Sequence, residues 1–328
     1  MSRILAAATL ALGVCAAGCI TLNLPGAGGG PLEESVVEGE SGPKILMLGL
    51  SGPLTTRAEE SRFGLGRRES PTARMREEID RALEDDEIAA LLLRIDSPGG
   101  TVIASDILYR EVRRFKEKSK HPVIAQFMGA GTSGAYYVAM AADEVRAYPT
   151  TVTGSIGVII AGINVSGLME RFGVADQTLT SGPFKDAGSP LRPMRPEERA
   201  QLESVARDLF GSFLAAVEAG RPKLARARIE SLADGRVYSA PQALEAGLVD
   251  ALGDLPQAVE AAKTAAGISG DARVVVYHRQ GEEPEGLYWA EAAASPANAL
   301  DLTRLAGPTF LYLWAPAGGL AEAFLQSP

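Results

Sequence analysis

Apolar runs of strand length alternate with amphipathic helical segments between residues 44 and 165, and this alternation constrains the fold more than any other feature. Ile45–Leu50 and Ile88–Ile95 are nearly continuous apolar runs, which is typical of strands buried on both faces of a sheet. A segment opened by Pro71 and a segment over residues 102–115 carry apolar residues at helical spacing. Strands that alternate with helices favour parallel pairing, so the pattern predicts an α/β domain.

The pattern continues along the chain. Further apolar runs predict strands at Pro122–Phe127, Val145–Tyr148, Ile156–Ile160 and Val274–Tyr277. A tight turn at Gly131–Gly134 is expected to lead into a helix of small residues that ends near Ala142. Later helical regions are predicted from Pro196 onward and over residues 240–266. We therefore expect a helical extension after the α/β core.

The N-terminal segment differs from the rest in composition. Residues 1–19 contain one cation, an apolar stretch and small residues that end at Cys19, which is the layout of a bacterial secretory signal with a lipobox-like end. Ala16 stands where that pattern usually has Leu, so a simple cleaved signal and an uncleaved anchor remain as alternatives to lipidation of Cys19. Residues 20–43 are rich in Gly, Pro and Glu and are expected to form a flexible tether. The expected domain then covers residues 44–265, and a C-terminal strand and tail cover 266–328.

Charge and residue scarcity exclude several classes of function. The formal net charge is −9 and no basic stripe is evident, which excludes a nucleic-acid-binding role. The chain has only two cysteines, Cys15 and Cys19, and two histidines, so a zinc cluster of Cys and His and a disulfide framework are both excluded. His121 precedes a strand at the end opposite the Ser133 turn, and His278 lies in a late strand. Neither histidine is well placed as a catalytic base, and no cofactor or metal is expected.

Two glycine-rich turns follow predicted strands. Asp96–Gly100 ends a buried strand, and its glycines leave backbone amides free to stabilise an oxyanion, although a plain strand-to-helix turn has the same pattern. In the second turn, Ser133 stands at the start of a helix among small residues that would admit a substrate backbone. A serine at this place is also a common helix cap. Ala135 stands where the G-x-S-x-G nucleophile elbow requires Gly, so this turn is not that motif.

A nucleophilic serine without a histidine needs another base. Lys185 is the candidate, because it lies in a loop of small residues, Ser181–Gly188. A lysine acts as a base only when its amine is neutral, which an apolar cleft favours. Most lysines are solvated surface charges, so the residue alone does not decide the chemistry.

Five segments in order resemble signal peptide peptidase A, also called protease IV, of bacteria. They are DSPGG at 96–100, GTSGAYYVA at 131–139, TGSIGV at 153–158, FKDAGSP at 184–190 and DGRVYSAPQALEAGLVDALG at 234–253. The resemblance implies a ClpP/crotonase-like spiral of β-β-α units and a Ser-Lys dyad, with Ser133 as nucleophile and Lys185 as general base. The spacing of these two residues suits the short, single-copy form of the family.

The resemblance also implies supporting residues. The oxyanion amide falls on Gly100, and Ser155 would orient the lysine amine. The amide of Gly134 as a second oxyanion donor is a geometric inference from its place after Ser133. Single-copy members resemble ring-shaped homo-oligomers in which neighbours complete a site, so we expect a ring, of which an octamer is one form.

The sequence thus predicts an endopeptidase of the bacterial cell envelope. It would be held at a membrane by its N-terminus, with the catalytic domain on the periplasmic side, and it would degrade cleaved signal peptides and other extended apolar polypeptides. Two alternatives remain open at this point: a crotonase-type acyl-CoA enzyme, which shares the fold and the glycine oxyanion hole, and a catalytically silent envelope scaffold.

Overall fold

A computed structural model describes residues 30–60, 67–280, 282, 284, 286–288 and 309–313 of the chain. Its main sheet joins seven strands side by side in the order β1 (Leu32–Glu38), β13 (Arg273–Arg279), β2 (Lys44–Ser51), β5 (Ile88–Ser97), β7 (Val123–Thr132), β8 (Glu144–Ala147) and β12 (Ala251–Leu252). All neighbours in this order pair in parallel except β1, which is antiparallel to β13. The predicted α/β fold with mainly parallel pairing is confirmed.

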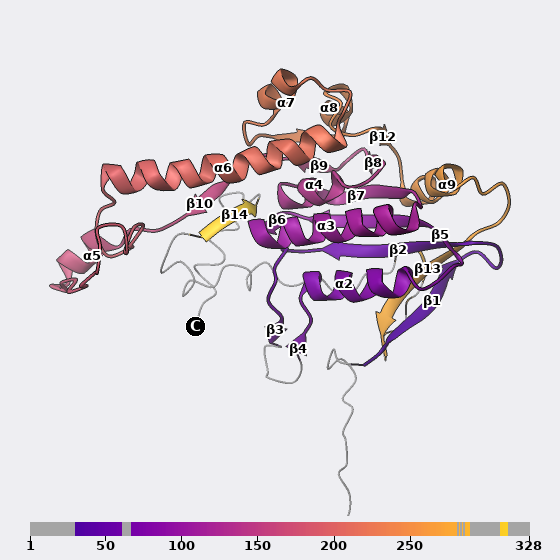
Figure 1. The fold of residues 1–328 in the computed structure, drawn as a ribbon, viewed down its shortest axis with the longest axis horizontal. Helices are drawn as coiled ribbons and strands as arrows, with labels where there is room; N and C mark the ends of the chain where they lie inside the picture. The colour runs from indigo at the N-terminus through magenta and orange to yellow at the C-terminus, as the bar shows by residue number, and fades with distance from the viewer. Residues whose placement is uncertain are drawn as a thin grey trace, which may run out of the picture.

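Helices cover both faces of this sheet (Figure 1). One face packs against α2 (Pro71–Ala82), α3 (Val102–Ser119) and α4 (Gly134–Ala139), and the other packs against α9 (Leu255–Ala265). Successive residues of β2 alternate between the two cores: Leu46 belongs to the α2 side, and Ile45 and Met47 belong to the α9 side. This alternation explains why the strands are apolar at nearly every position.

The carboxyl end of β7 carries a short extension of the sheet. β9 (Val152–Gly154) pairs in parallel with the last residues of β7, and β11 (Val237–Ser239) pairs with β9 in antiparallel fashion. A separate three-stranded sheet has the order β10 (Ile159–Ala161), β14 (Thr309–Leu313) and β6 (Gly99–Thr101). A two-stranded ribbon joins β3 (Glu59–Glu60) to β4 (Arg67–Arg68).

The long helix α6 (Pro196–Gly220) forms the predicted helical extension, followed by α7 (Arg226–Leu232) and α8 (Ala240–Glu245). Figure 1 shows that α6 runs past the sheet, so that its first turns stand beyond β10. The short helix α5 (Ser166–Arg171) and the loops around it lie at this far end. We call residues 162–195, between β10 and α6, the arm.

The structure corrects three expectations. Residues 32–38 were expected to belong to a flexible tether, but they form β1, because their backbone pairs with β13 and Leu32 and Glu34 are held by core and ion-pair contacts. The strand predicted at Ile156–Ile160 is wrong in its bounds: β9 ends before Ser155, whose φ of 50° breaks the extended backbone, and β10 begins only at Ile159.

The third correction concerns residues 240–266, which form two helices rather than one region, since β12 and the cap residue Asp254 intervene. The signal segment, Cys19 and residues 20–29 of the expected tether lie outside the described residues. Within the described part of the chain, no helix has the length and apolar character needed to cross a membrane.

Candidate active site

Ser133 stands between the end of β7 and the start of α4 in a strained conformation. Its φ is 52° and its ψ is −116°, a region that residues with a Cβ rarely occupy. Its amide donates to the Gly154 carbonyl at 2.7 Å, and its carbonyl accepts from the Tyr137 amide at 2.9 Å. The hydroxyl makes no capping hydrogen bond, so the helix-cap explanation left open by the sequence does not describe this serine.

The backbone around Ser133 is fixed by neighbouring strands. β7 and β9 pair up to Thr132, and the Thr153 hydroxyl donates to the Gly131 carbonyl at 2.6 Å. Gly131 has no room for a side chain, because a Cβ there would meet the Phe127 ring at 2.2 Å. These contacts hold the turn rigidly enough for the strain at Ser133 to persist.

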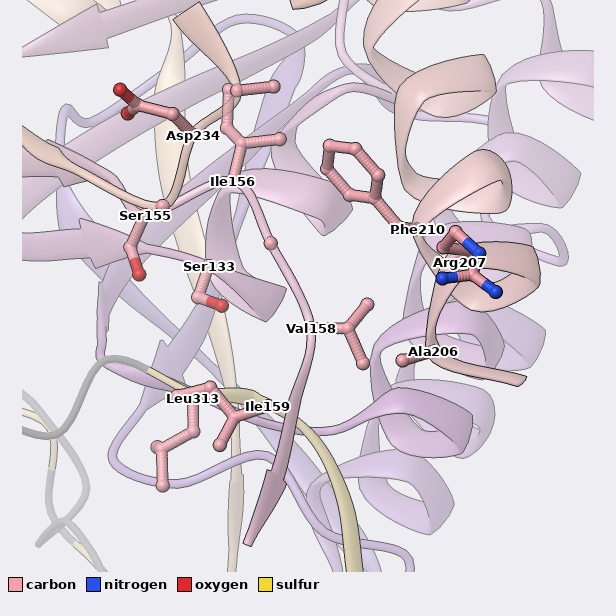
Figure 2. Close-up of a pocket in the computed structure, with 13 residues that line it drawn as sticks. Ser133, Ser155, Ile156, Val158, Ile159, Ala206, Arg207, Phe210, Asp234 and Leu313 are labelled. Atoms are coloured by element: carbon pink, nitrogen blue, oxygen red, sulfur yellow. The ribbon is translucent and has the colours of Figure 1, made fainter. Parts of the chain in front are cut away.

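A cavity of about 470 Å³ opens beside Ser133. Its described lining is mainly apolar and comprises Ser133, Ser155, Ile156, Gly157, Val158, Ile159, Ala206, Arg207, Phe210, Ala233, Asp234, Gly235 and Leu313. Figure 2 shows Ser155 next to Ser133 on one side of the pocket, with Val158 between them and α6, from which Phe210 projects. Ser155 also has a positive φ, of 50°, and its amide donates to the Arg236 carbonyl at 2.8 Å. The structure therefore brings the two predicted serines to one cavity.

The glycines expected to supply oxyanion amides converge on the same place. A Cβ added to Gly99 would meet the Gly134 nitrogen at 2.7 Å and the Ser133 Cβ at 3.2 Å, and a Cβ added to Gly134 would stand 3.3 Å from the Gly100 nitrogen. Gly100 itself is packed against backbone, since a Cβ there would meet the Leu54 carbonyl oxygen at 2.0 Å. Only glycines permit this close approach of β6 to the start of α4.

Lys185 is placed apart from these residues. It is exposed and lies in the arm, and it is not among the residues that line the cavity of Ser133. Figure 1 shows the chain between α5 and α6 at the far end of α6, away from α4. The lining contains no histidine either, and His278 is buried in β13, where its Nε2 lies 2.9 Å from the Ser35 hydroxyl. Within one chain, Ser133 therefore has no amine or imidazole beside it among the described lining residues.

The loop that carries Lys185 is held by an ion-pair cluster that the sequence analysis missed. The Arg192 guanidinium donates to Asp186 at 2.8 Å and to Glu198 at 2.9 Å, and Arg195 donates to Glu198 through Nε at 2.9 Å. Hydrogen bonds from Arg192 lower the pKa of Glu198 to about 2, with further bonds from Arg195 in the same direction. The only signal in the sequence was the acidic first turn of the helix at Pro196. The partners of Glu198 could not be read from it.

Strand β14 is the second feature that the sequence analysis missed. It pairs with β6, which carries Gly100, and with β10, so it crosses the site. Its apolar composition was evident at Phe310–Trp314, but nothing local indicates where such a strand lies; Trp314 is outside the described residues. Among the described residues, no group of three or more His, Cys, Asp or Glu is arranged to hold a metal ion.

Comparisons with known proteins bear on the family to which this chain belongs. The model of peptidase family S49 matches residues 115–269, which include Ser133, Ser155 and Lys185. A relative from Enterococcus faecium, named after signal peptide peptidase SppA, is 34% identical over 245 residues, covering 75% of this chain and 70% of that protein. Serine protease SPPA of Arabidopsis thaliana chloroplasts is 37% identical over 58% of this chain.

Protease 4 of Salmonella typhi is 31% identical over 175 residues, which cover 53% of this chain. The match spans only 28% of protease 4 and 28% of the Arabidopsis protein. Among solved structures, a membrane-bound stomatin-specific protease has a TM-score of 0.41 at 14% identity over 67% of this chain and 85% of that one, a likeness too low to support an inference. The Enterococcus relative and the family match, together with a strained serine that lines a mainly apolar cavity, lead to one conclusion: the chain belongs to peptidase family S49, with signal peptide peptidase SppA and protease 4, and is a serine peptidase.

Proposed function

We propose that Ser133 is the nucleophile of a Ser-Lys dyad whose base, Lys185, comes from the arm of a neighbouring copy of the chain. The observation that supports Ser133 is its buried, strained position at the turn where β6 approaches the start of α4, with a hydroxyl that makes no capping hydrogen bond. The placement of Lys185 supports a neighbour as its target, because the arm carries this lysine away from the Ser133 of its own chain.

The proposed chemistry is acyl transfer to serine. Neutral Lys185 accepts the proton of the Ser133 hydroxyl while Oγ attacks the scissile carbonyl carbon, and the Gly100 and Gly134 amides donate to the oxyanion that forms. Lys185 then gives the proton to the leaving amine as the peptide C–N bond breaks. A water molecule, deprotonated by Lys185, hydrolyses the acyl ester and returns Ser133 to its hydroxyl form. Ser155 would hold the lysine amine in line.

The proposed substrates are extended apolar polypeptides, with cleaved signal peptides as the leading class. The apolar lining from Ile156 to Ile159 and the strand edges around the cavity favour an extended backbone with apolar side chains. The signal-like segment 1–19 supports a location in the bacterial envelope, with the peptidase domain on the periplasmic side and the N-terminus, through Cys19, as its anchor.

The surface of the arm supports assembly into a ring. Its exposed apolar side chains are Leu168, Phe172, Val174, Leu179, Phe184, Leu191 and Met194. So many exposed apolar side chains on one projecting segment are typical of a surface that is buried against another subunit. A head-to-tail contact between copies generates a closed ring when the rotation closes.

Mixing two inactive variants tests the proposal directly. Ser133→Ala and Lys185→Ala should each abolish peptide cleavage while remaining folded by circular dichroism. When they are co-assembled in equal amounts, about a quarter of the sites would combine an intact Ser133 with an intact Lys185 from the neighbour, so activity should return to about that fraction of wild type.

The outcomes separate the parts of the proposal. No recovery in mixed assemblies, with assembly verified by light scattering, would place the dyad within one chain. Full activity in either single variant would contradict the dyad itself. A serine-directed fluorophosphonate probe that labels wild type at Ser133, but not the Ser133→Ala variant, checks the nucleophile independently of substrate choice.

A further inference from the structure

Ser97 is a buried serine that the proposed chemistry does not use. It ends β5 within the motif DSPGG, Pro98 separates it from β6, and it is 0% exposed. Its hydroxyl donates to the Gly52 carbonyl at 2.6 Å and accepts from the Gly99 amide at 3.1 Å. A serine hydroxyl has one proton to donate, so this hydroxyl is committed to the backbone and links two stretches of chain that are far apart in the sequence.

The segment Gly52–Leu54, which we call the brace, lies along β6. The Leu54 amide donates to the Gly99 carbonyl at 2.8 Å, and the Leu54 carbonyl accepts from the Thr101 amide at 2.9 Å. Leu54 thereby forms a parallel bridge with Gly100. The brace therefore holds β6 by backbone hydrogen bonds on both sides of the residue expected to supply the oxyanion amide.

The brace sets the direction of the Gly100 amide. The Gly99 carbonyl and the Gly100 amide belong to one planar trans peptide unit, in which C=O and N–H point in opposite directions. Because this carbonyl points at the Leu54 amide, the Gly100 N–H points away from the brace. A Cβ added to Gly134 would stand 3.3 Å from the Gly100 nitrogen, so the start of α4, next to Ser133, lies close to this amide.

Gly99 is the flexible point of this arrangement. Its φ is 94°, and without a side chain its backbone has little intrinsic resistance to rotation. Two hydrogen bonds restrain it, since its amide donates to the Ser97 hydroxyl and its carbonyl accepts from the Leu54 amide. These bonds hold the peptide units on both sides of the Gly99 Cα. Together they fix the two torsion angles that orient the Gly100 amide.

We propose that Ser97 is a positioning residue of this peptidase, whose hydroxyl holds Gly99 in the conformation that aims the Gly100 amide at the oxyanion. The proposal rests on the peptidase function proposed above and adds to it a residue that touches neither substrate nor reacting atoms. Without the hydroxyl, the buried Gly99 amide has no acceptor, which is unfavourable. The backbone at Gly99 then rotates toward another partner, and the Gly100 amide shifts with it.

Replacing Ser97 tests the proposal. In Ser97→Ala, kcat for a fluorogenic apolar peptide should fall about tenfold or more while KM stays within about twofold, because the oxyanion forms only on attack and substrate binding does not depend on its donor. Ser97→Thr keeps the hydroxyl and should retain most of kcat. If the added methyl group prevents folding, Ser97→Cys replaces it. The thiol is a weaker donor and acceptor, so its kcat should lie between those of wild type and Ser97→Ala.

The matched control is Ser70→Ala. Ser70 is also a buried serine whose hydroxyl accepts from a backbone amide, that of Ala73 at 3.2 Å, but it caps α2 and does not contact the brace. Its replacement should lower the free energy of unfolding, measured by urea denaturation, and leave kcat within about twofold of wild type. The two variants therefore separate lost stability from lost alignment.

A transition-state analogue gives a readout that destabilisation alone does not move. With the peptide aldehyde acetyl-Leu-Leu-leucinal, Ser133 Oγ bonds to the aldehyde carbon as the C=O π bond breaks, and the hydroxyl proton passes to Lys185, which leaves an oxyanion. The inhibition constant of this aldehyde should rise about tenfold in Ser97→Ala. The corresponding peptide alcohol forms no oxyanion, so it should bind wild type and variant equally.

The outcomes are distinguishable. A folded Ser97→Ala variant with the kcat of wild type would overturn the proposal. Equal weakening of the aldehyde and the alcohol would also overturn it, because the substitution would then distort the whole cavity rather than the oxyanion donor. The proposed function fails separately, if wild type cleaves no apolar peptide and its Ser133 does not react with a fluorophosphonate.

Discussion

The backbone conformation of Ser133 is energetically unfavourable, and the proposed role of this serine as nucleophile explains why it is retained. A positive φ with ψ near −116° is sterically unfavourable for any residue with a Cβ, and strain of this kind costs about 1–3 kcal/mol. Gly99, just opposite, also has a positive φ, of 94°, but as a glycine it bears no such cost. The turn aims the serine at the place where β6 and α4 meet, and an unstrained serine at a helix start would instead cap the helix.

Replacing Ser133 therefore has an unusual effect on stability. Ala and Gly at this position both remove the proposed nucleophile, but only Gly removes the steric conflict of the Cβ. We expect Ser133→Gly to have a free energy of unfolding about 1 kcal/mol higher than Ser133→Ala, although a Gly variant is usually less stable than the Ala variant at the same position. Urea denaturation of both variants measures the difference. A Gly variant less stable than the Ala variant would mean that the turn is not strained.

Local sequence motifs made several site residues predictable, but the relative placement of residues that are far apart in the sequence could not be predicted. Ser133, Gly100 and Gly134 belong to strand-to-helix turns, whose geometry follows from small residues at fixed positions, so their convergence could be anticipated. Lys185 could be recognised as a candidate only by its loop and by resemblance. Its distance from Ser133 depends on how the arm leaves the body of the protein, which no local pattern encodes.

At the scale of secondary-structure elements, the ion-pair cluster around Glu198 fixes the position of the loop that carries Lys185. Glu198 occupies the third position of α6, where its carboxylate also accepts from the Arg195 amide at 3.0 Å and so caps the helix. Because the same carboxylate binds Arg192, and Arg192 binds Asp186, the start of α6 and the loop are joined through a single side chain. Glu198 is thus a positioning residue for Lys185.

Neutralising Glu198 should release this loop. Glu198→Gln is expected to leave the helix folded but to make the loop at least several-fold more sensitive to trypsin, which can cut after Lys185. Cleavage of peptide should decrease with it. Glu203→Gln changes an exposed carboxylate on the same helix and should alter neither property. Unchanged trypsin sensitivity in the Glu198 variant would contradict the anchoring role.

The stability of the loop that carries Lys185 should decrease at acidic pH. Because hydrogen bonds from Arg192 lower the pKa of Glu198 from an ordinary 4.5 to about 2, the folded state favours the charged carboxylate. The stabilisation is therefore complete above about pH 4.5 and is lost as the pH falls toward 2. Hydrogen exchange of the loop amides should rise over this window in wild type, after correction for the intrinsic pH effect. Glu198→Gln, which has no proton to gain at this position, should show a smaller rise, because Asp186 remains as the second carboxylate whose pKa is lowered by its hydrogen bond from Arg192.

Elements that depend on distant partners were the ones the sequence did not reveal. Residues 32–38 have the Gly- and Glu-rich surroundings of a linker, yet they form β1 because β13, more than 200 residues later, offers an unpaired edge. The predicted strand at Ile156–Ile160 has suitable apolar residues, but pairing of β9 with β11 ends at Gly154, and Ser155 turns the backbone away. β14 likewise depends on two edges that are far from it in sequence.

For the whole molecule, the two proposals about the arm, assembly and delivery of the base, depend on each other. It projects from the body at the far end of α6, and two of its most exposed apolar side chains are Leu179, 97% exposed, and Phe172, 77% exposed. It also carries Lys185. If the arm packs on a neighbour, one contact both buries apolar surface and delivers the base. A separated chain would then keep a folded Ser133 site but lack its base.

Breaking the arm contact should therefore reduce assembly and activity together. Leu179→Asp and Phe172→Asp place a charge where an apolar side chain would be buried, and we expect each to raise the dissociation constant of the assembly by about tenfold or more. Sedimentation and peptide cleavage measured on the same dilution series should fall in parallel, and higher protein concentration should restore both. Leu244→Asp, on α8 and 40% exposed, is the matched control and should change neither. In separated chains, no neighbour supplies Lys185 to Ser133. Full activity under those conditions would therefore show that Lys185 of a neighbour is not required.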